Sequence, residues 1–179
     1  KWCVIISTFN NSTGWITANT WTNVVVTRNG TTKELNIYLN GTPAQTTTTD
    51  TTTDDFTAYD KLSIGNDNYS GGRYWYEGLI DEVSIYDSVV DANSIYNSGE
   101  PTTISGAVAY WKLGEDATFS NNWLVPNSAL DNYSKFSFNF DGVDDYIDCG
   151  NILDKDGTTP FSISAWIKCP SDIGTDVIA

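Results

Sequence analysis

The sequence predicts an all-β fold in which two antiparallel sheets pack face to face, with at most one short helix. Apolar and polar residues alternate at period two in several segments, for example in residues 35–39 and 161–167, and this period is typical of a strand with one buried face. Asn-Gly pairs, which tolerate the positive φ of hairpin loops, follow some of these segments. Only residues 91–97 have a helical pattern, so helix is a minor component.

The first predicted hairpin joins residues 24–27 to residues 35–39, and Asn29-Gly30 lies in the loop between them. A further turn is predicted at Asn40-Gly41. Residues 45–55 are rich in Thr and contain three Asp. Because Thr is favourable in strands, we interpret this stretch as a strand with a polar loop rather than as a disordered linker.

The middle of the chain contains a strand, the one helix and a boundary. Residues 77–86 predict a strand, and Asp91 is suited to the N-cap of the helix at 91–97, with Gly99 as its stop. The polar, Pro-containing run 98–103 is the best candidate for a boundary between two parts of the chain. Strand-like segments then resume at residues 107–115, 136–147 and 161–168.

Composition narrows the classes of function. Nine basic residues against 23 acidic ones give a net charge of −14, which excludes the clustered cations that phosphate binding needs. No apolar run approaches the roughly 20 residues of a membrane span, so we expect neither nucleic-acid binding nor membrane insertion. An acidic β protein rich in Thr, Asn, Ser and Gly is expected outside cells or on a virion surface. The three cysteines have no metal-site spacing and are interpreted as isolated small residues in strands.

Several motifs, in order, resemble a known family. The chain from Trp21 to Gly41, followed by residues 62–65 and 78–86, resembles the C-terminal half of a laminin-G-like (pentraxin-like, concanavalin A-like) jelly-roll domain. Residues 138–147 with 161–168 resemble the N-terminal half of the same family. The resemblance therefore covers most of the chain in permuted order, as residues 1–100 and then 101–179. The segment 110–117 is also similar to laminin-G-like segments in marine phage structural proteins.

The resemblance implies a two-sheet antiparallel jelly-roll sandwich in which strands of both halves interleave, so that neither half buries its faces alone. We expect residues 101–179 to complete the sandwich of residues 1–100, either in the same chain or with a neighbouring repeat or subunit. Phe138 or Ile163 should then lie against the strand at 35–39. The permuted order also indicates a window on a longer polypeptide.

No catalytic residues are predicted. The chain has no His for a triad. Its acidic residues do not reproduce the Glu-x-Asp-x-x-Glu motif that laminarinase-type hydrolases of the same fold carry on one strand. The nearest approach is Glu77 with Asp81 and Glu82, but adjacent strand residues point to opposite faces. We therefore expect a protein that is not an enzyme.

A structural Ca²⁺ site is expected at Asp81, Asp141 and Gly142. Asp81 has the sequence phase of Leu79 and Val83, an otherwise apolar face where a carboxylate is costly unless it is paired or metal-bound. Asp141, followed by the permissive Gly142, ends a predicted strand. The resemblance implies a Ca²⁺ between these two segments, and oxygen ligands suit that ion. The alternative is that Asp141 and Asp144 cap a turn while Asp81 accepts a backbone amide.

The loop at residues 66–76 is the candidate carbohydrate site, because aromatic faces with amide and carboxylate groups are typical of sugar-binding sites. Its candidate residues are Asn66, Asp67, Asn68, Tyr74 and Trp75. The alternative is that Tyr74 and Tyr76, or Trp75, pack in the core as part of the next strand. Trp21, Trp111 and Trp166 are predicted to be core residues, and Trp15 and Trp123 are freer candidates.

Two functions remain from these observations. The first is a recognition and adhesion module that binds a glycan or another surface ligand and is repeated within a larger extracellular or virion-surface protein. The second is a structural decoration, fibre or filament subunit whose copies exchange strands. Family-level resemblance carries most of this inference, so the ligand itself is a hypothesis.

Overall fold

The computed structural model describes most of the β framework of the chain. The described residues are 16–44, 47–51, 63–66, 75–102, 105–113, 137–150 and 158–170, together with the backbone of 118–119 and 123–124. Within them the secondary structure is antiparallel sheet with one short α-helix and one turn of 3₁₀ helix, η3 (Asn97–Gly99), so the predicted all-β sandwich is confirmed.

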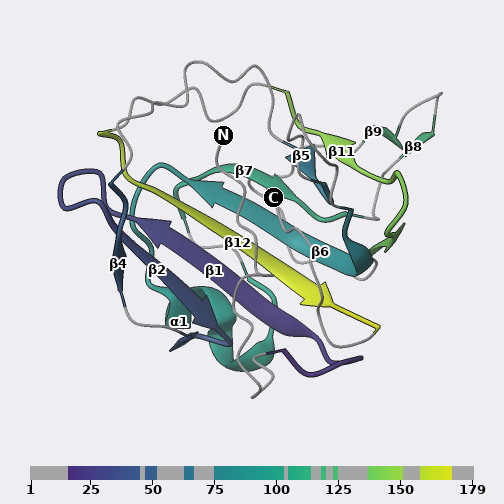
Figure 1. Cartoon of the computed structure of the whole chain (residues 1–179), viewed down its shortest axis with the longest axis horizontal. Coiled ribbons are helices and arrows are strands. Elements are labelled where there is room, and N and C mark those ends of the chain that lie inside the picture. The colour runs from purple at the N-terminus through teal and green to yellow at the C-terminus, as the bar shows by residue number, and fades with distance from the viewer. Residues whose placement is uncertain are drawn as a thin grey trace.

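One large sheet dominates the molecule (Figure 1). Its strands are β1 (Thr22–Arg28), β2 (Glu34–Leu39), β3 (Thr42–Pro43), β4 (Thr48–Thr49), β6 (Glu77–Tyr86), β7 (Ala107–Trp111), β10 (Phe138–Asp141) and β12 (Phe161–Lys168). The order is β10-β6-β12-β1-β2-β3, with β7 on β6 and β4 on β2. Two small sheets are formed by β5 (Ser63–Ile64) with β11 (Ile147–Asp148) and by β8 (Thr118–Phe119) with β9 (Trp123–Leu124).

The middle strand of the large sheet comes from late in the chain. β12 pairs with β1 from Thr22↔Ile167 to Arg28↔Phe161, and on its other side it pairs with β6. Figure 1 shows it as the yellow strand between the two. Ile163 lies opposite Val26, which in turn lies opposite Ile37 of β2. Strands from both parts of the sequence therefore share one sheet in this chain.

The predicted hairpin and turn are present. Arg28 ends β1 and Glu34 begins β2, and in the loop between them the Asn29 side chain accepts the backbone N–H groups of Thr31 (2.8 Å) and Thr32 (3.0 Å). The positive φ in this loop belongs to Lys33 (62°). Gly30 is needed for space instead, since a Cβ there would lie 1.7 Å from the carbonyl oxygen of Thr158.

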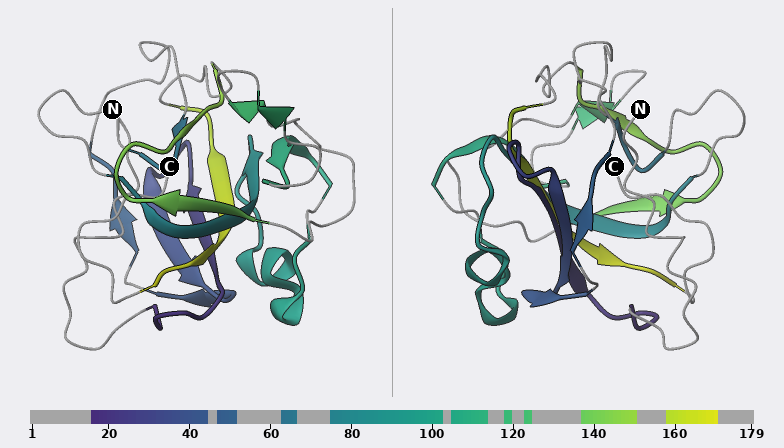
Figure 2. Two further views of the ribbon diagram at one scale, coloured as in Figure 1. Left: turned by 90° about the vertical axis from the view of Figure 1, so that its right-hand side faces the viewer. Right: turned by 60° about the vertical axis from the view of Figure 1, so that its left-hand side comes forward.

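The two faces of the large sheet are covered differently (Figure 2). On the core face, side chains such as Val24, Val83 and Ala165 pack with Ile64 and Ile147 of the β5–β11 sheet. On the opposite face, here called the helix face, Val25 and Tyr86 pack with Ala92 and Ile95 of helix α1 (Ala92–Tyr96). Each strand thus contributes alternate residues to two separate clusters.

The helix is short because its ends are set by local chemistry. Asp91 is the N-cap, as predicted, and its side chain accepts the backbone N–H of Asn93. The helix stops at Asn97, whose φ of 45° is left-handed, two residues before the predicted stop at Gly99. No helix among the described residues has the length and apolarity needed to cross a membrane.

A β-bulge in β6 overturns the predicted phase of Asp81. The pairing with β12 shifts between Ser164 and Trp166, and Glu82 has a left-handed φ of 53°. The extra residue places Ile80 and Val83, rather than Leu79 and Val83, on the core face. Asp81 therefore does not point to the core face with Ile80 and Val83, and the prediction that its carboxylate lies on the apolar face was wrong.

Candidate functional site

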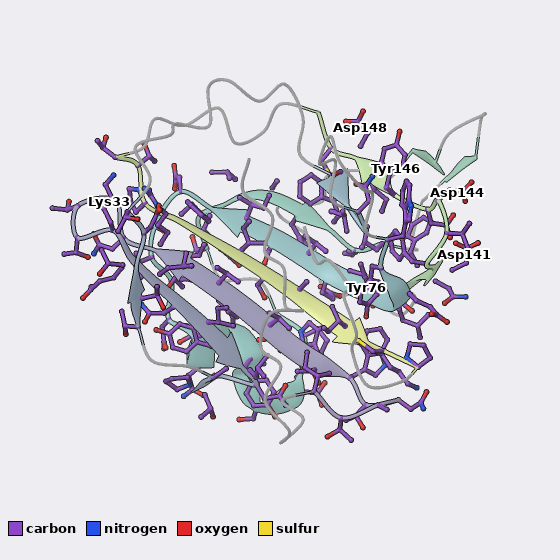
Figure 3. The ribbon with its side chains drawn as sticks, in the orientation of Figure 1. Lys33, Tyr76, Asp141, Asp144, Tyr146 and Asp148 are labelled. Carbon is purple, nitrogen blue, oxygen red and sulfur yellow. The ribbon has the colours of Figure 1, made fainter. Side chains whose placement is uncertain are left out.

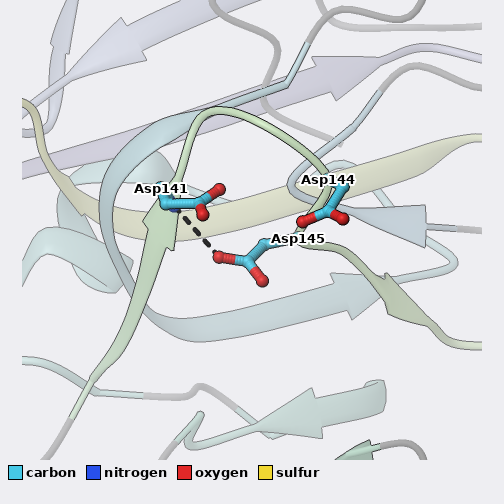
Figure 4. Close-up of side chains that lie close together, drawn as sticks. All are labelled: Asp141, Asp144 and Asp145. Atoms are coloured by element: carbon cyan, nitrogen blue, oxygen red, sulfur yellow. Dashed lines mark hydrogen bonds between the residues drawn. The ribbon is translucent and has the colours of Figure 1, made fainter.

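An acidic loop joins β10 to β11 at one end of the molecule. It begins at Asp141, the last residue of β10, which pairs with Glu77 at the start of β6. Asp144 and Asp145 follow, and ligand atoms of the three carboxylates lie within 4.8 Å of one another (Figure 4). Three negative side chains thus converge in one exposed loop.

The loop is shaped by its own hydrogen bonds. The backbone N–H of Val143 donates to Asp141 Oδ1 (2.8 Å), and the backbone N–H of Asp141 donates to Asp145 Oδ2 (3.0 Å), which is the dashed line in Figure 4. Gly142 has a φ of 77°, and a Cβ there would lie 2.9 Å from the Cβ of Glu77. Asp141 therefore caps the tight turn at Gly142, as the alternative to metal binding predicted for this residue.

Asp81 and Asp141 do not meet along β6. Asp141 lies opposite Glu77, and Asp81 is four residues farther along the same strand, which is about 13 Å at the usual rise of roughly 3.3 Å per residue. Asp81 Oδ1 instead accepts the backbone N–H of Glu82 (2.8 Å). The predicted ligand set is thereby divided, with Asp141 and Gly142 at the acidic loop and Asp81 at the bulge.

The chemistry of the acidic loop is compatible with a hard cation. Its side chains offer only oxygen atoms, which suit Ca²⁺, and Ca²⁺ takes 6–8 oxygens, so three carboxylates would need help from backbone oxygens or water. Exposed acidic groups also occur without any ion. The loop is thus a candidate site whose ligand count is incomplete from side chains alone.

An aromatic pair lies beside the acidic loop. The ring centroids of Trp75 and Tyr146 are 6.0 Å apart with an interplanar angle of 44°. Tyr146 is 50% exposed, and it follows Asp145 directly. Figure 3 shows Tyr146 with Asp141 and Asp144 at the same end of the molecule. This end therefore presents aromatic and carboxylate groups together.

The predicted carbohydrate loop is only partly within the described residues. Asn66 and Trp75 form an isolated β-bridge, which brings the two ends of the loop together. Asn66 is buried, and its Oδ1 has no hydrogen-bond partner within the described part of the chain. The candidates Asp67, Asn68 and Tyr74 lie outside the described residues. Tyr76 is fully buried against Phe140, as the alternative for this segment predicted.

Two of the three tryptophans predicted to be core residues are buried in strands, and Trp21 is not. Trp111 and Trp166 are buried, and Trp166 stacks on Tyr96 of α1 at 5.9 Å between ring centroids. Trp21 is half-buried. Trp15 lies outside the described residues, and only the backbone of Trp123 is described, in β9.

The two described cysteines lie in or beside the core as thiols. Cys169 is fully buried, with its Sγ 3.2 Å from the hydroxyl of Tyr76. Burial, with a smaller contribution from the charge of Asp148, raises the pKa of the Cys149 thiol to about 12. A thiol with such a pKa stays protonated near neutral pH and is a poor nucleophile, so Cys149 has a packing role.

Asp145 and Tyr146 are absent from the site predicted from the sequence, and the prediction gives Asp144 only the role of a turn cap. The signal was available in the run Asp141-Gly-Val-Asp-Asp-Tyr, where acidic residues at i, i+3 and i+4 surround a glycine turn. A tight turn folds such side chains back toward one another. What the sequence did not contain was the position of Trp75, which reaches Tyr146 only through the tertiary fold.

Comparison with known proteins supports the same architecture. Residues 6–96, just over half of the chain, match a laminin-G-type family model described as the Concanavalin A-like lectin/glucanases superfamily. No curated protein and no solved structure matches the chain. The matched segment includes β1, β2, β6 and α1. With this match and its antiparallel sandwich, the chain belongs to the laminin-G-like family of the concanavalin A-like superfamily.

Proposed function

We propose that this domain is a non-catalytic recognition and adhesion module that binds glycan at the end of the sandwich formed by Trp75, Tyr146 and the acidic loop. The observation that carries the proposal is the part-exposed Trp75–Tyr146 pair, with ring centroids 6.0 Å apart, directly beside Asp144 and Asp145. A sugar ring packs its C–H face on an aromatic ring, while carboxylates accept its hydroxyl groups. Family membership supports a binding role in general terms.

Glycan-array binding tests this proposal. Trp75→Ala and Tyr146→Ala each remove one face of the aromatic pair and should reduce binding at least tenfold. Val89→Ala is the matched control, because Val89 is 49% exposed between β6 and α1, away from the aromatic pair. Far-UV circular dichroism checks that each variant is folded. Sugar binding by none of the proteins would instead support a purely structural role.

We also propose that Ca²⁺ binds Asp141, Asp144 and Asp145 with a structural role. The carboxylate spacing of 4.8 Å or less supports it, and a bound ion would hold the turn that presents Tyr146. An ion that binds only the folded state stabilises it by about 2.7 kcal/mol when the free ion is at a hundredfold excess over Kd. This stabilisation raises the melting temperature. Melting with Ca²⁺ and with chelator should therefore differ, and Asp144→Asn should shrink the difference. Equal melting temperatures in the two conditions would remove the ion from the proposal.

The setting of the module is part of the same proposal. The net charge of −14 and the Thr- and Asn-rich composition are suited to an extracellular or virion surface. Such a module gains avidity when it is repeated along a larger protein, because each further contact becomes intramolecular. Localisation of the parent protein by surface labelling would test this setting.

A further inference from the structure

The two parts of the chain depend on each other for sheet pairing. We define the first part as residues 16–102 and the second part as residues 105–170. In the second part, β7 and β10 pair with β6, β12 pairs with β1 and β6, and β11 pairs with β5. Among the described strands, the only pairing within the second part is the β8–β9 hairpin. The hydrogen-bonded sheet is therefore itself the interface between the parts.

The position that β12 occupies between β1 and β6, here called its seat, is specific for this strand. Toward the core face, β12 inserts Ala165 and Ile167, which are 3% and 0% exposed. Toward the helix face, Asn23 Nδ2 donates to Ser164 Oγ (3.2 Å). Ser162 Oγ accepts the backbone N–H of Val90 (3.1 Å) and donates to the carbonyl of Ser88 (2.6 Å). A slip by one residue would exchange the two faces and lose these bonds, so the seat selects one register.

The chain passes from the first part to the second through a strained segment. Asn97, Ser98 and Gly99 have successive left-handed φ values of 45°, 60° and 101°. Glycine adopts this conformation freely, and asparagine often does so at a helix C-cap, whereas serine does so only at a cost, so the strain lies at Ser98. Glu100 is extended and Pro101 follows, and Gly106 has a φ of 98°. A more open path at Ser98 would release this strain.

We propose that two copies of this chain exchange their second parts. In the exchanged dimer, β7 and β10 of one copy pair with β6 of the other, β12 lies between the other copy's β1 and β6, and β11 pairs with the other copy's β5. The hinge is the described segment 97–102. A two-fold exchange of this kind remakes every contact of the monomer and alters only the hinge. The seat accepts this partner because its register and both of its faces match β12, as the preceding contacts show.

The exchange has a consequence for the aromatic end of the sandwich. Trp75 belongs to the first part and Tyr146 to the second, so in the exchanged dimer each aromatic pair combines residues of two copies. The exchanged dimer therefore carries two such composite surfaces. The exchange does not rest on glycan binding, because its grounds are the sheet pairing and the hinge conformation.

Hinge variants of the full chain give the first test. Deleting Glu100, Pro101 and Thr102 should leave the connection too short for the two parts of one chain to pair with each other. The dimer-to-monomer ratio, measured by light scattering after refolding, should therefore rise at least tenfold. Ser98→Gly removes the cost of one left-handed residue in the closed hinge and should lower that ratio below the wild-type value. A folded deletion variant that stays monomeric at high protein concentration would overturn the proposal.

Register-specific crosslinking gives a second test that does not depend on the deletion variant folding. Cys3, Cys149 and Cys169 are first replaced by Ala. Val25→Cys and Ser164→Cys are then placed on separate copies, because Val25 lies opposite Ser164 across β1 and β12. After the two are refolded together with oxidised glutathione as the oxidant, a disulfide-linked heterodimer is expected on a non-reducing gel.

Two controls fix the meaning of that crosslink. Both cysteines in one chain should give an intrachain disulfide, which shows that the geometry permits the bond. Val25→Cys mixed with Ala165→Cys places the second thiol on the opposite face and should give no heterodimer. A heterodimer of equal yield with Ala165→Cys would mean unspecific association. That outcome, or no heterodimer with Ser164→Cys when the intrachain control succeeds, would overturn the exchange.

Discussion

The two faces of the large sheet are buried to a similar extent but by different chemistry. On the core face, the central strands present aliphatic side chains: Val24, Val26, Val83, Ile85, Ala165 and Ile167. On the helix face, the same strands bury five polar side chains beside the apolar Val25 and Tyr86: Asn23, Ser84, Ser162, Ser164 and Glu82. Apolar packing is non-directional, whereas hydrogen bonds are directional. The comparison indicates that the core face supplies most of the stability and the helix face fixes the register.

A cavity on the core face should have the largest effect. Ile85 is fully buried, and Ile85→Ala removes three carbon atoms from a packed cluster. The expected loss is about 2–5 kcal/mol of unfolding free energy, measured by denaturant titration with unchanged m-value. Val89→Ala, at an exposed position, is the control. A loss below that of the helix-face variants would reverse the assignment of the two faces.

Removal of a buried hydrogen bond on the helix face should come next. The hydroxyl of Tyr110 donates to the carboxyl group of Glu82 at the bulge, and both side chains are buried. Tyr110→Phe keeps the ring and removes this donor, so it should cost about 1.5–3 kcal/mol. In the double variant Tyr110→Phe with Glu82→Gln, the second substitution should cost less than it does alone. Additive losses would mean that the two groups are not coupled.

A smaller effect is expected at Ser162, where β12 meets the chain between β6 and α1. Its hydroxyl donates to the Ser88 carbonyl and accepts the N–H of Val90. Ser162→Ala loses both bonds without a large cavity and should cost about 1–2 kcal/mol. Amide hydrogen exchange at Val90 should also become faster, because its N–H loses its partner. An unchanged rate of amide exchange at Val90 would show that the Ser162 hydroxyl does not protect this N–H.

The smallest effect is expected at the start of the helix that covers the helix face. The hydroxyl of Ser94 and the backbone N–H of Asn93 donate to Asp91, and these bonds lower the pKa of its carboxyl below the ordinary 3.8. A lowered folded-state pKa means that the stabilisation is complete above the unfolded pKa and is lost as the pH falls through the folded value. Asp91→Ala should therefore lower the melting temperature slightly at pH 7. The difference from wild type should narrow below about pH 3.8, and a difference that grows in acid would contradict the sign.

Local patterns were enough for the elements whose partners lie close in sequence. Asn40-Gly41 predicted its turn, and the structure gives both residues positive φ between Leu39 and Thr42, which pair. Asp91 predicted the N-cap of α1. In each case the deciding contacts lie within a few residues, where sequence periodicity and turn chemistry act directly.

The candidate site was less accessible to the same reasoning. Sequence phase put Asp81 among apolar neighbours, but a bulge at Glu82 reversed the phase. An inserted residue of this kind leaves no period-two signature, because it depends on how β12 pairs across the sheet. The turn around Gly142 was visible locally, whereas the contact of Tyr146 with Trp75, 71 positions away, was not.

By itself the sequence determined the class of fold, because period-two alternation and turn residues act over a few positions at a time. Family-like motifs such as residues 78–86 then indicated the sandwich to which the strands belong. Only the tertiary structure decided that β12 lies between β1 and β6, and which face each residue of β6 occupies. Sheet neighbours are chosen by complementary faces and hydrogen bonds between distant segments, and that choice is a property of the assembled sheet.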